Sequence, residues 1–244
     1  EAGLCDYAMA HRPSYGVLFY MMAQQYGAFS LDETGEAVFD EERFAEMLRF
    51  FQRNAQISRR EQPESWNEAN DIFIQGRAAV YFGASWSIFD SVKERGGDEA
   101  KLTAQYVPAL FPAVEKGGRP FTFSTTMMSA ASSRCEYPEA VREIMADAYS
   151  DWEGLAQHCA ENYRLPVSKT SAASQVFLDK HAVSDTMYMM DYTSYMPVRA
   201  DNQIWLNAVY QAVVSVENGS GTPEEVARSF AQDLADSGIA VRSN

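Results

Sequence analysis

The sequence predicts a helix-rich α/β fold. Helix start and stop signals mark about eight helices, and three or four short apolar runs of strand character lie among them. Helices and strands alternate in the middle of the chain, as they do in α/β proteins. The strands are few for so many helices. Either the sheet is small, or further strands lie outside this sequence.

Capping residues mark the helices of the first half of the chain. Asp40 is an N-cap, and Phe39 before it and Phe44 after it form a hydrophobic staple. Ser65 forms a capping box with Glu68, which predicts a helix that ends near the next glycine. The expected helices of this half cover residues 15–26, 41–54, 65–76 and 87–94.

Extended segments separate these helices. Residues 78–82 are a short apolar run between two helices, and residues 105–110 and 121–130 also have strand character. Residues 111–120 contain prolines and glycines at close spacing, which favours a loop. We therefore expect short strands on both sides of a central loop.

The second half is expected to be mostly helical. Pro138 opens a helix at the first position, where proline costs least. Ser150 with Glu153, and Thr222 with Glu225, form capping boxes that open two more helices. Further helices are expected over residues 174–181 and 201–217.

The charge balance narrows the class of partner. The chain has 34 acidic and 20 basic side chains, and its formal net charge is −14. Nucleic acids and anionic membranes both need a basic face on the protein, so neither is an expected partner. No run of residues approaches the ~18–20 apolar residues that span a bilayer.

The three cysteines form no disulfide framework, because their number is odd and small. A bridge between Cys135 and Cys159 is supported by spacing alone. Buried free thiols are the favoured interpretation, and Cys5 has no apolar leader before it that would make it a lipid-anchor site.

Motifs for catalysis and cofactor binding are absent from the sequence. Of the three histidines, His11 stands beside Arg12 and Pro13 in an expected loop, and we expect it on the surface. There is no Gly-x-Ser-x-Gly, no Walker A motif and no Gly-x-Gly-x-x-Gly after a strand. We expect no catalytic residue, no metal and no cofactor. A pair of carboxylates that converges from distant positions stays open as a glycosidase site.

Aromatic side chains stand at the ends of expected elements, where α/β folds bind ligands. Trp86 follows a strand, Tyr15 begins a helix, and Trp205 lies near the start of another helix. Their polar neighbours are Ser85, Asn202 and Gln203. Rings beside hydroxyl and amide groups suit a sugar, which has apolar faces and polar edges. The alternative for each tryptophan is a place in the core.

Residues 73–80 and 83–86 form the most specific pattern in the chain, FIQGRAAV followed by GASW. This pattern resembles the F-x-x-G-K-A-A-M…G-S-W stretch of the extracellular solute-binding proteins of ABC importers, in their maltose-binding-protein-like, carbohydrate-binding family. Four further stretches resemble that family in the same order along the chain. They are residues 35–40, 129–140, 164–167 and 219–225.

The resemblance implies a type II periplasmic-binding-protein-like fold, helix-rich and two-lobed, without the N-terminal βαβ units of the first lobe. It assigns residues 1–120 to the second lobe, residues 121–167 to an excursion into the first lobe, and residues 168–244 to the C-terminal helices of the second lobe. It also implies that the helices within residues 138–162 lack the sheet on which they pack, so that an apolar face is left uncovered.

The resemblance further implies the substrate-binding component of an ABC transporter. Such a protein captures a sugar or a related small solute in a cleft between its lobes and delivers it to a membrane permease. Trp86 and Trp205 match positions where the family stacks a ring on the sugar, and Ser85 and Tyr15 match neighbouring contacts. Local chemistry alone adds Asn202 and Gln203.

The expected partners are a small-molecule solute, with a sugar favoured, and the membrane subunits of an ABC transporter; the chain itself is expected to be a monomer. The expected location is periplasmic or extracellular, with any lipid anchor in an N-terminal segment outside this sequence. Two alternatives stay open. One is a carbohydrate-active enzyme that uses cleft carboxylates, and the other is a helical interaction module with a Met-rich surface at residues 187–190.

Overall fold

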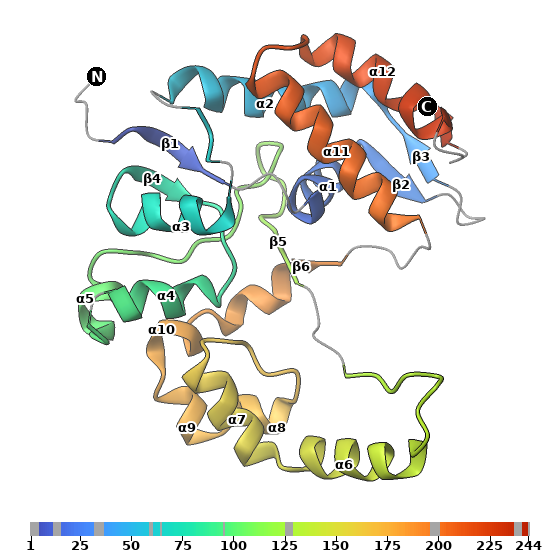
Figure 1. Ribbon diagram of the computed structural model, residues 1–244. Helices are drawn as coiled ribbons and strands as arrows, with labels where there is room; N and C mark the ends of the chain where they lie inside the picture. Colours follow the sequence, from blue (N-terminus) through green and yellow to red (C-terminus); the bar gives the residue numbers. More distant parts are fainter. Residues whose placement is uncertain are drawn as a thin grey trace. The chain divides into compact units, whose positions relative to one another are not determined.

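A computed structural model shows two compact units (Figure 1). Unit 1 consists of residues 1–83, 112–123 and 194–244, and unit 2 of residues 84–111 and 124–193. The structure describes residues 5–11, 16–31, 37–58, 61–63, 65–94, 96–124, 129–195, 201–236 and 241–243. The division of the chain into lobes that the resemblance implies, at residues 120 and 167, stays a prediction.

Unit 1 contains two small sheets. In the first, β1 (Tyr7–Ala10) pairs in parallel with β4 (Ala78–Tyr81). In the second, β3 (Ala37–Phe39) lies between β2 (Phe29–Leu31), its antiparallel partner, and β7 (Val241–Ser243), its parallel partner. Parallel sheets are usually larger and covered on both faces. Within the described residues the β1–β4 sheet has two strands only.

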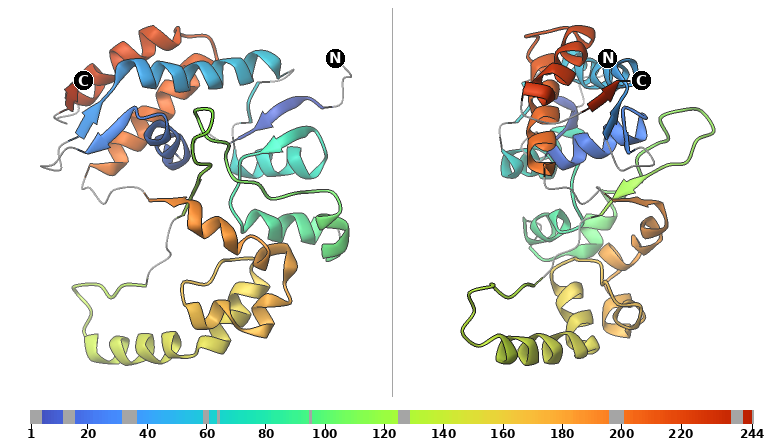
Figure 2. Two further views of the ribbon diagram at one scale, coloured as in Figure 1. Left: turned by 180° about the vertical axis from the view of Figure 1, so that it is seen from behind. Right: turned by 90° about the vertical axis from the view of Figure 1, so that its right-hand side faces the viewer.

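The helices of unit 1 pack against these sheets and against one another. The helix α11 packs against α1, α2 and α12, and the last two lie side by side in all views (Figures 1 and 2). The helix α3 packs on β1 and β4. The bounds are α1 (Gly16–Gln25), α2 (Glu41–Ile57), α3 (Trp66–Ile74), α11 (Asn202–Glu217) and α12 (Pro223–Asp236).

The caps predicted for three of these helices are confirmed. A carboxylate oxygen of Asp40 accepts a hydrogen bond of 3.0 Å from the backbone N–H of Arg43 at the start of α2. The Ser65 hydroxyl accepts one of 3.0 Å from the N–H of Glu68. The side chains of Thr222 and Glu225 each accept a bond from the other's backbone N–H, at 3.2 and 3.0 Å. These bonds satisfy amide groups that have no partner inside the helix.

An aromatic cluster fills the space between α2, α11, α12 and the three-stranded sheet. The ring centroids of Phe44 and Phe230 are 4.5 Å apart, and those of Phe29 and Trp205 are 5.0 Å apart. The rings of Phe39 and Phe44, 5.5 Å apart, form the predicted staple. All five side chains are at most 4% exposed. Clustered rings of this size dominate the energetics of a core, so this cluster is the main packing feature of unit 1.

The helices of unit 2 are mostly short. They include α4 (Ser87–Glu94), α6 (Pro138–Ser150) and α7 (Trp152–Glu161), close to the predicted positions. The short elements are α5 (Glu99–Thr103), α8 (Lys169–Ala172), α9 (Gln175–Leu178), α10 (His181–Ser184) and a 3-10 helix over Met187–Tyr192. The strand pair β5 (Thr122–Phe123) and β6 (Thr193–Ser194) lies where the chain crosses between the units.

Several predictions for this region are wrong. Residues 105–110 form no strand, and α5 lies just before them. The helix expected over residues 174–181 is divided into α9 and α10. The cap of α7 is Asp151, which accepts a hydrogen bond of 2.9 Å from the Gly154 N–H, and Ser150 instead ends α6. Acidic and hydroxyl side chains both cap helices well, so the sequence does not distinguish Ser150 from Asp151 as the cap.

The predicted uncovered face is found on α6. This helix has no buried residue, whereas α7 buries Ala156 and Ala160. The expectation for residues 138–162 is therefore confirmed for α6 and wrong for part of α7. In the described part of the chain, no helix is both long enough and apolar enough to cross a membrane.

His11 is not on the surface, and the expectation for it is wrong. Its side chain is fully buried, and Nε2 lies 2.8 Å from a carboxylate oxygen of Glu217, which is itself 7% exposed. The rings of Phe19 and Phe51 pack edge-on against the imidazole, at centroid distances of 5.5 and 5.3 Å. The pair joins the end of β1 to the end of α11 across 206 residues of sequence.

The substitution His11→Leu should lower the free energy of unfolding by about 3 kcal/mol or more, because it leaves the Glu217 carboxyl group buried without its partner. Chemical denaturation monitored by circular dichroism measures the change. The matched control is His181→Leu, because the His181–Asp185 pair is more than 70% exposed on both sides. Exposed ion pairs contribute little to stability, so the control substitution should leave the free energy of unfolding nearly unchanged. Equal effects of the two substitutions would contradict the assigned role of His11.

Candidate functional site

The residues predicted to contact a solute are divided between the two units. Ser85 and Trp86 belong to unit 2, and Asn202, Gln203 and Trp205 belong to unit 1. Tyr15 lies outside the described residues.

Ser85 and Trp86 form the turn that opens α4. The turn is fixed by two bonds, because the Ser87 N–H donates to the Ala84 carbonyl at 2.9 Å and the Ala84 N–H donates to the Ser87 hydroxyl at 3.3 Å. At Gly83, a Cβ atom would lie 2.1 Å from the ring of Tyr81, so glycine lets the ring approach the backbone. Ser85 and Trp86 are both partly exposed, which leaves part of each side chain open to contact.

Trp205 has a different environment. Its side chain is 2% exposed and packs against Tyr20, Phe29 and Phe230. The indole N–H donates to a carboxylate oxygen of Asp201 at 3.4 Å, one turn earlier in the chain. This burial accounts for Trp205 as a core side chain. Its stacking on a solute stays a prediction.

The two polar residues beside Trp205 lie in the first turn of α11. Asn202 is partly buried, and Gln203 is exposed. The Gln203 amide donates to the side-chain oxygen of Asn207 at 2.9 Å, an i,i+4 pair along the helix. Gln203 is thus already engaged by its own helix, and its contact with a solute also stays a prediction.

The start of α11 lies close against the start of α1. A Cβ atom at Gly16 would lie 2.0 Å from the carbonyl oxygen of Leu206, so a larger residue would force the two backbones apart. Gly16 follows Tyr15 directly in the sequence, and Leu206 follows Trp205. Two of the predicted aromatic positions are therefore adjacent, along the chain, to residues that touch.

Sequence reasoning missed a polar cluster in unit 2. The Tyr163 hydroxyl donates to a carboxylate oxygen of Glu99 at 2.5 Å, and the Lys180 ammonium group donates to the same oxygen at 2.9 Å. Tyr163 is 5% exposed and has a φ of +51°, a conformation that usually takes glycine. The Arg164 N–H donates to the Cys159 carbonyl at 2.9 Å, as in a Schellman helix end. In the sequence, the one local indication of this cluster is that a tyrosine and not a glycine follows α7. That indication does not identify Glu99 as the partner of Tyr163.

The cluster changes the ionisation of both acidic partners. Burial raises the pKa of the Tyr163 hydroxyl, and the hydrogen bond to Glu99 and its charge raise that pKa further. For Glu99, burial opposes ionisation, but the bonds from Tyr163 and Lys180 and the nearby charges of Lys180 and His181 outweigh it, so its pKa is lowered. Glu99 is thus an ionised structural group that ties α5 to the segment after α7.

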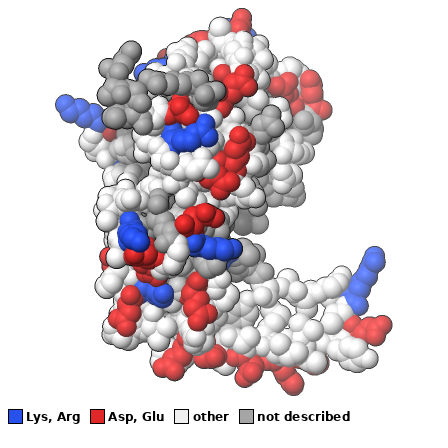
Figure 3. All heavy atoms as spheres, turned by 60° about the vertical axis from the view of Figure 1, so that its left-hand side comes forward, with Lys and Arg blue, Asp and Glu red and all other residues white. Residues whose placement is uncertain are grey.

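Metal-ligating groups are not clustered in the described part of the chain, where no set of three or more His, Cys, Asp and Glu side chains could hold an ion. Cys5, Cys135 and Cys159 are free thiols and partly buried, so no bridge joins Cys135 to Cys159. On the face drawn in Figure 3, basic side chains lie singly or in small groups beside acidic ones.

No protein-family model matches the chain, and no curated protein matches it. Solved structures do match. A maltose/maltodextrin-binding domain, MalE, from Bdellovibrio bacteriovorus bound to maltotriose gives a TM-score of 0.72 at 14% identity, over 95% of this chain and 60% of that chain. An ABC substrate-binding protein from Listeria monocytogenes in complex with cycloalternan gives 0.62 at 16% identity, over 96% and 60%. The maltose-maltodextrin binding protein of Alicyclobacillus acidocaldarius gives 0.60 at 14% identity, over 94% and 62%.

These likenesses establish the fold. The chain has the α/β fold of type II periplasmic-binding proteins, and its structural neighbours are sugar-binding ABC substrate-binding proteins, as the sequence predicted. The chain spans about 60% of the length of the solved structures that it matches. The chain therefore corresponds to only part of the fold of these neighbours.

The substitution Glu99→Gln should lower the free energy of unfolding near pH 7 by about 1–3 kcal/mol, because it removes a charged acceptor of two hydrogen bonds. A carboxyl group with a lowered folded-state pKa stabilises the protein above its ordinary pKa near 4.5 and loses that contribution as the pH falls through the lower value. The difference between the wild type and the variant should therefore shrink as the pH falls below about 4.5.

Denaturation curves at a series of pH values measure this difference. The substitution Tyr163→Phe is the companion variant, because it keeps the ring and removes one of the two bonds, so it should give a smaller loss. A difference between wild type and Glu99→Gln that stays constant across this pH range would contradict the role given to the carboxylate.

Proposed function

We propose that the chain is part of the substrate-binding component of an ABC importer, which captures a sugar or a related small solute and delivers it to a membrane permease. The observation that carries the proposal is the fold, which matches solved sugar-binding proteins over nearly the whole chain. The solved structures that the chain matches include complexes with maltotriose, with cycloalternan and, for a cyclo/maltodextrin-binding protein, with maltotetraose. A glucose-based oligosaccharide is the first class of solute to test.

The chemistry of the turn before α4 supports this proposal. Trp86 is a partly exposed ring held on a hydrogen-bonded turn, and the adjacent Ser85 hydroxyl is partly exposed as well. A rigid ring contacts the apolar face of a sugar at little cost in conformational entropy. A hydroxyl beside it pairs with the polar edge, where an unpaired group would cost about 1–3 kcal/mol.

The proposal extends to place and partners. The protein would work in the periplasm or outside the cell, where a solute-binding protein meets its solute, and its protein partners would be the membrane subunits of the transporter. Binding would be by a monomer. Tyr15, Asn202, Gln203 and Trp205 are the further proposed contacts.

The alternative of a carbohydrate-active enzyme gains no supporting observation. General acid catalysis by a carboxyl group needs a raised pKa, so that the proton is held near neutral pH. Glu99 shows the opposite shift and is bonded to Tyr163 and Lys180. Release of sugar from any glycoside would nevertheless favour this alternative over a binding protein.

Calorimetric titration of the complete gene product with maltotriose, maltotetraose and cycloalternan tests the proposal. At least one should bind, and Trp86→Ala should weaken its Kd by about tenfold, the effect expected when one stacked ring is lost. Trp205→Ala is a poor probe, because removing a buried tryptophan costs about 3–5 kcal/mol of stability.

The matched control is Trp152→Ala. Trp152 is also a tryptophan at a helix start in unit 2, with 43% of its surface exposed. This variant should bind like the wild type. Absence of binding to all three oligosaccharides, or an equal loss in both tryptophan variants, would contradict the proposal.

A further inference from the structure

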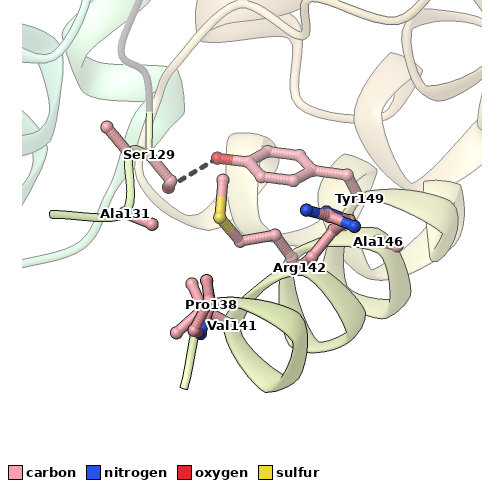
Figure 4. Close-up of a pocket in the computed structure, with 9 residues that line it drawn as sticks. Ser129, Ala131, Pro138, Val141, Arg142, Ala146 and Tyr149 are labelled. Atoms are coloured by element: carbon pink, nitrogen blue, oxygen red, sulfur yellow. Dashed lines mark hydrogen bonds between the residues drawn. The ribbon is translucent and has the colours of Figure 1, made fainter. Parts of the chain in front are cut away.

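A groove of about 590 Å³ lies beside α6 in unit 2 (Figure 4). Its lining is mostly apolar, and the two hydroxyl groups in it, those of Ser129 and Tyr149, lie 2.7 Å apart and bond to each other. These groups are therefore already paired. The exposed end of α11 in unit 1 differs, because there an asparagine amide stands beside the backbone nitrogen of a glycine, two groups that can react with each other.

Helix α11 ends in an exposed turn over residues 218–220. Asn218 is the C-cap, and Gly219 follows it with a φ of +74°, a left-handed conformation that glycine adopts without strain. The Ser220 N–H donates to the Ser215 carbonyl at 2.8 Å, as in a Schellman helix end. A Cβ atom at Gly219 would have no heavy atom within 4 Å, so the turn is open to solvent.

The side chain of Asn218 is held within the same turn. Its amide oxygen accepts hydrogen bonds from the Ser220 N–H at 3.0 Å and from the Ser220 hydroxyl at 2.5 Å. Two donors on a carbonyl oxygen stabilise the negative charge that the oxygen gains when a nucleophile attacks its carbon. The backbone nitrogen of Gly219 is adjacent along the chain, and glycine carries no side chain that would obstruct its attack.

The turn has to open before these two groups can meet. The ψ of Asn218 is 0°, and the Gly219 nitrogen reaches Cγ only after rotation about the Cα–C bond of Asn218. Exposed helix ends open locally at little cost in free energy. Because residues 218–220 are all exposed, this opening moves no buried side chain of the turn.

We propose that Asn218 is a site of spontaneous modification, at which its side-chain amide is converted to an acid. The backbone nitrogen of Gly219 attacks Cγ of Asn218 and closes a succinimide ring, and the side-chain nitrogen leaves as ammonia with the proton of the Gly219 N–H. Water then opens the ring at either of its carbonyl groups, which gives aspartate or isoaspartate. One water is consumed, one ammonia is released, and nothing is oxidised or reduced. The proposal does not rest on the proposed function.

The end of α7 provides an internal comparison. Asn162 is its C-cap, with φ −107° and ψ 10°, close to the −88° and 0° of Asn218. The residue after Asn162 is also left-handed, but it is Tyr163, whose side chain is buried. The Asn162 amide nitrogen donates to the His158 carbonyl at 2.9 Å, so this side chain is held along its own helix. The two helix ends thus share a backbone conformation and differ in the residue that supplies the nucleophile.

Conversion of Asn218 adds negative charge next to the buried pair that joins α11 to β1. Glu217, whose carboxylate lies 2.8 Å from Nε2 of His11, immediately precedes Asn218. A carboxylate at residue 218 stands at the negative end of the α11 dipole, where it is unfavourable. Isoaspartate also lengthens the backbone by one atom, which displaces the Ser220 N–H from the Ser215 carbonyl. Conversion therefore loosens the end of α11.

Peptide mapping by mass spectrometry tests the proposal on the folded 244-residue chain, incubated at physiological temperature and mildly alkaline pH. The acid form should accumulate at residue 218 about tenfold faster, or more, than at residue 162. The control variant is Asn218→Gln, which keeps an amide but would have to close a larger ring. Its residue 218 should stay an amide over the same period.

The melting temperature gives a second readout. Asn218→Asp has one of the two products from the start, so its Tm should lie about 2 °C below that of the wild type before incubation. The Tm of the wild type should fall as conversion proceeds. Equal conversion at residues 162 and 218 would overturn the proposal. Conversion of residue 218 in the urea-unfolded chain but not in the folded one would also overturn it, because the fold would then protect the site.

Discussion

The packing of α11 around Trp205 is the interaction on which the rest of unit 1 depends. The indole ring contacts rings from α1, β2 and α12, so one side chain joins three elements that are far apart in the sequence. The close approach of Gly16 to the Leu206 backbone brings α1 near enough for this contact. The buried pair of His11 and Glu217 fixes the other end of the same helix to β1. Since α11 is held at both ends, its first turn has a fixed position beside the start of α1.

This arrangement bears on how a tryptophan can be assigned a function. Trp205 and Trp86 match the family pattern equally well in the sequence, yet their surroundings differ. Trp205 is surrounded by rings, whereas Trp86 is partly exposed on a turn that backbone hydrogen bonds hold in place. A partly exposed and rigid ring is the better candidate for a solute contact, and a ring already packed on several sides contributes first to stability. The ligand-binding proposal therefore relies more on Trp86 than the sequence alone suggested.

What could be predicted from sequence followed from local chemistry. The caps at Asp40, Ser65 and Thr222 depend on residues within three or four positions, so their signals are complete in a short window. The fold class followed from alternation of elements and the order of several motifs. The burial of His11 depends on Glu217, and the bond of Tyr163 depends on Glu99, and neither partner is near in sequence. The strand predicted at residues 105–110 is absent for a similar reason. A strand requires a pairing partner, and the apolar pattern of the strand itself does not identify that partner.

The two units differ in how many large side chains they bury. Unit 1 closes an aromatic core, whereas the described part of unit 2 buries few large side chains, and no residue of α6 is buried. The central claim is that unit 1 has a closed core of its own and that α6 is not part of one. Hydrogen–deuterium exchange of the 244-residue chain tests it most directly. We expect strong protection of α2, α11 and α12 and fast exchange in α6. Strong protection of α6 would contradict it.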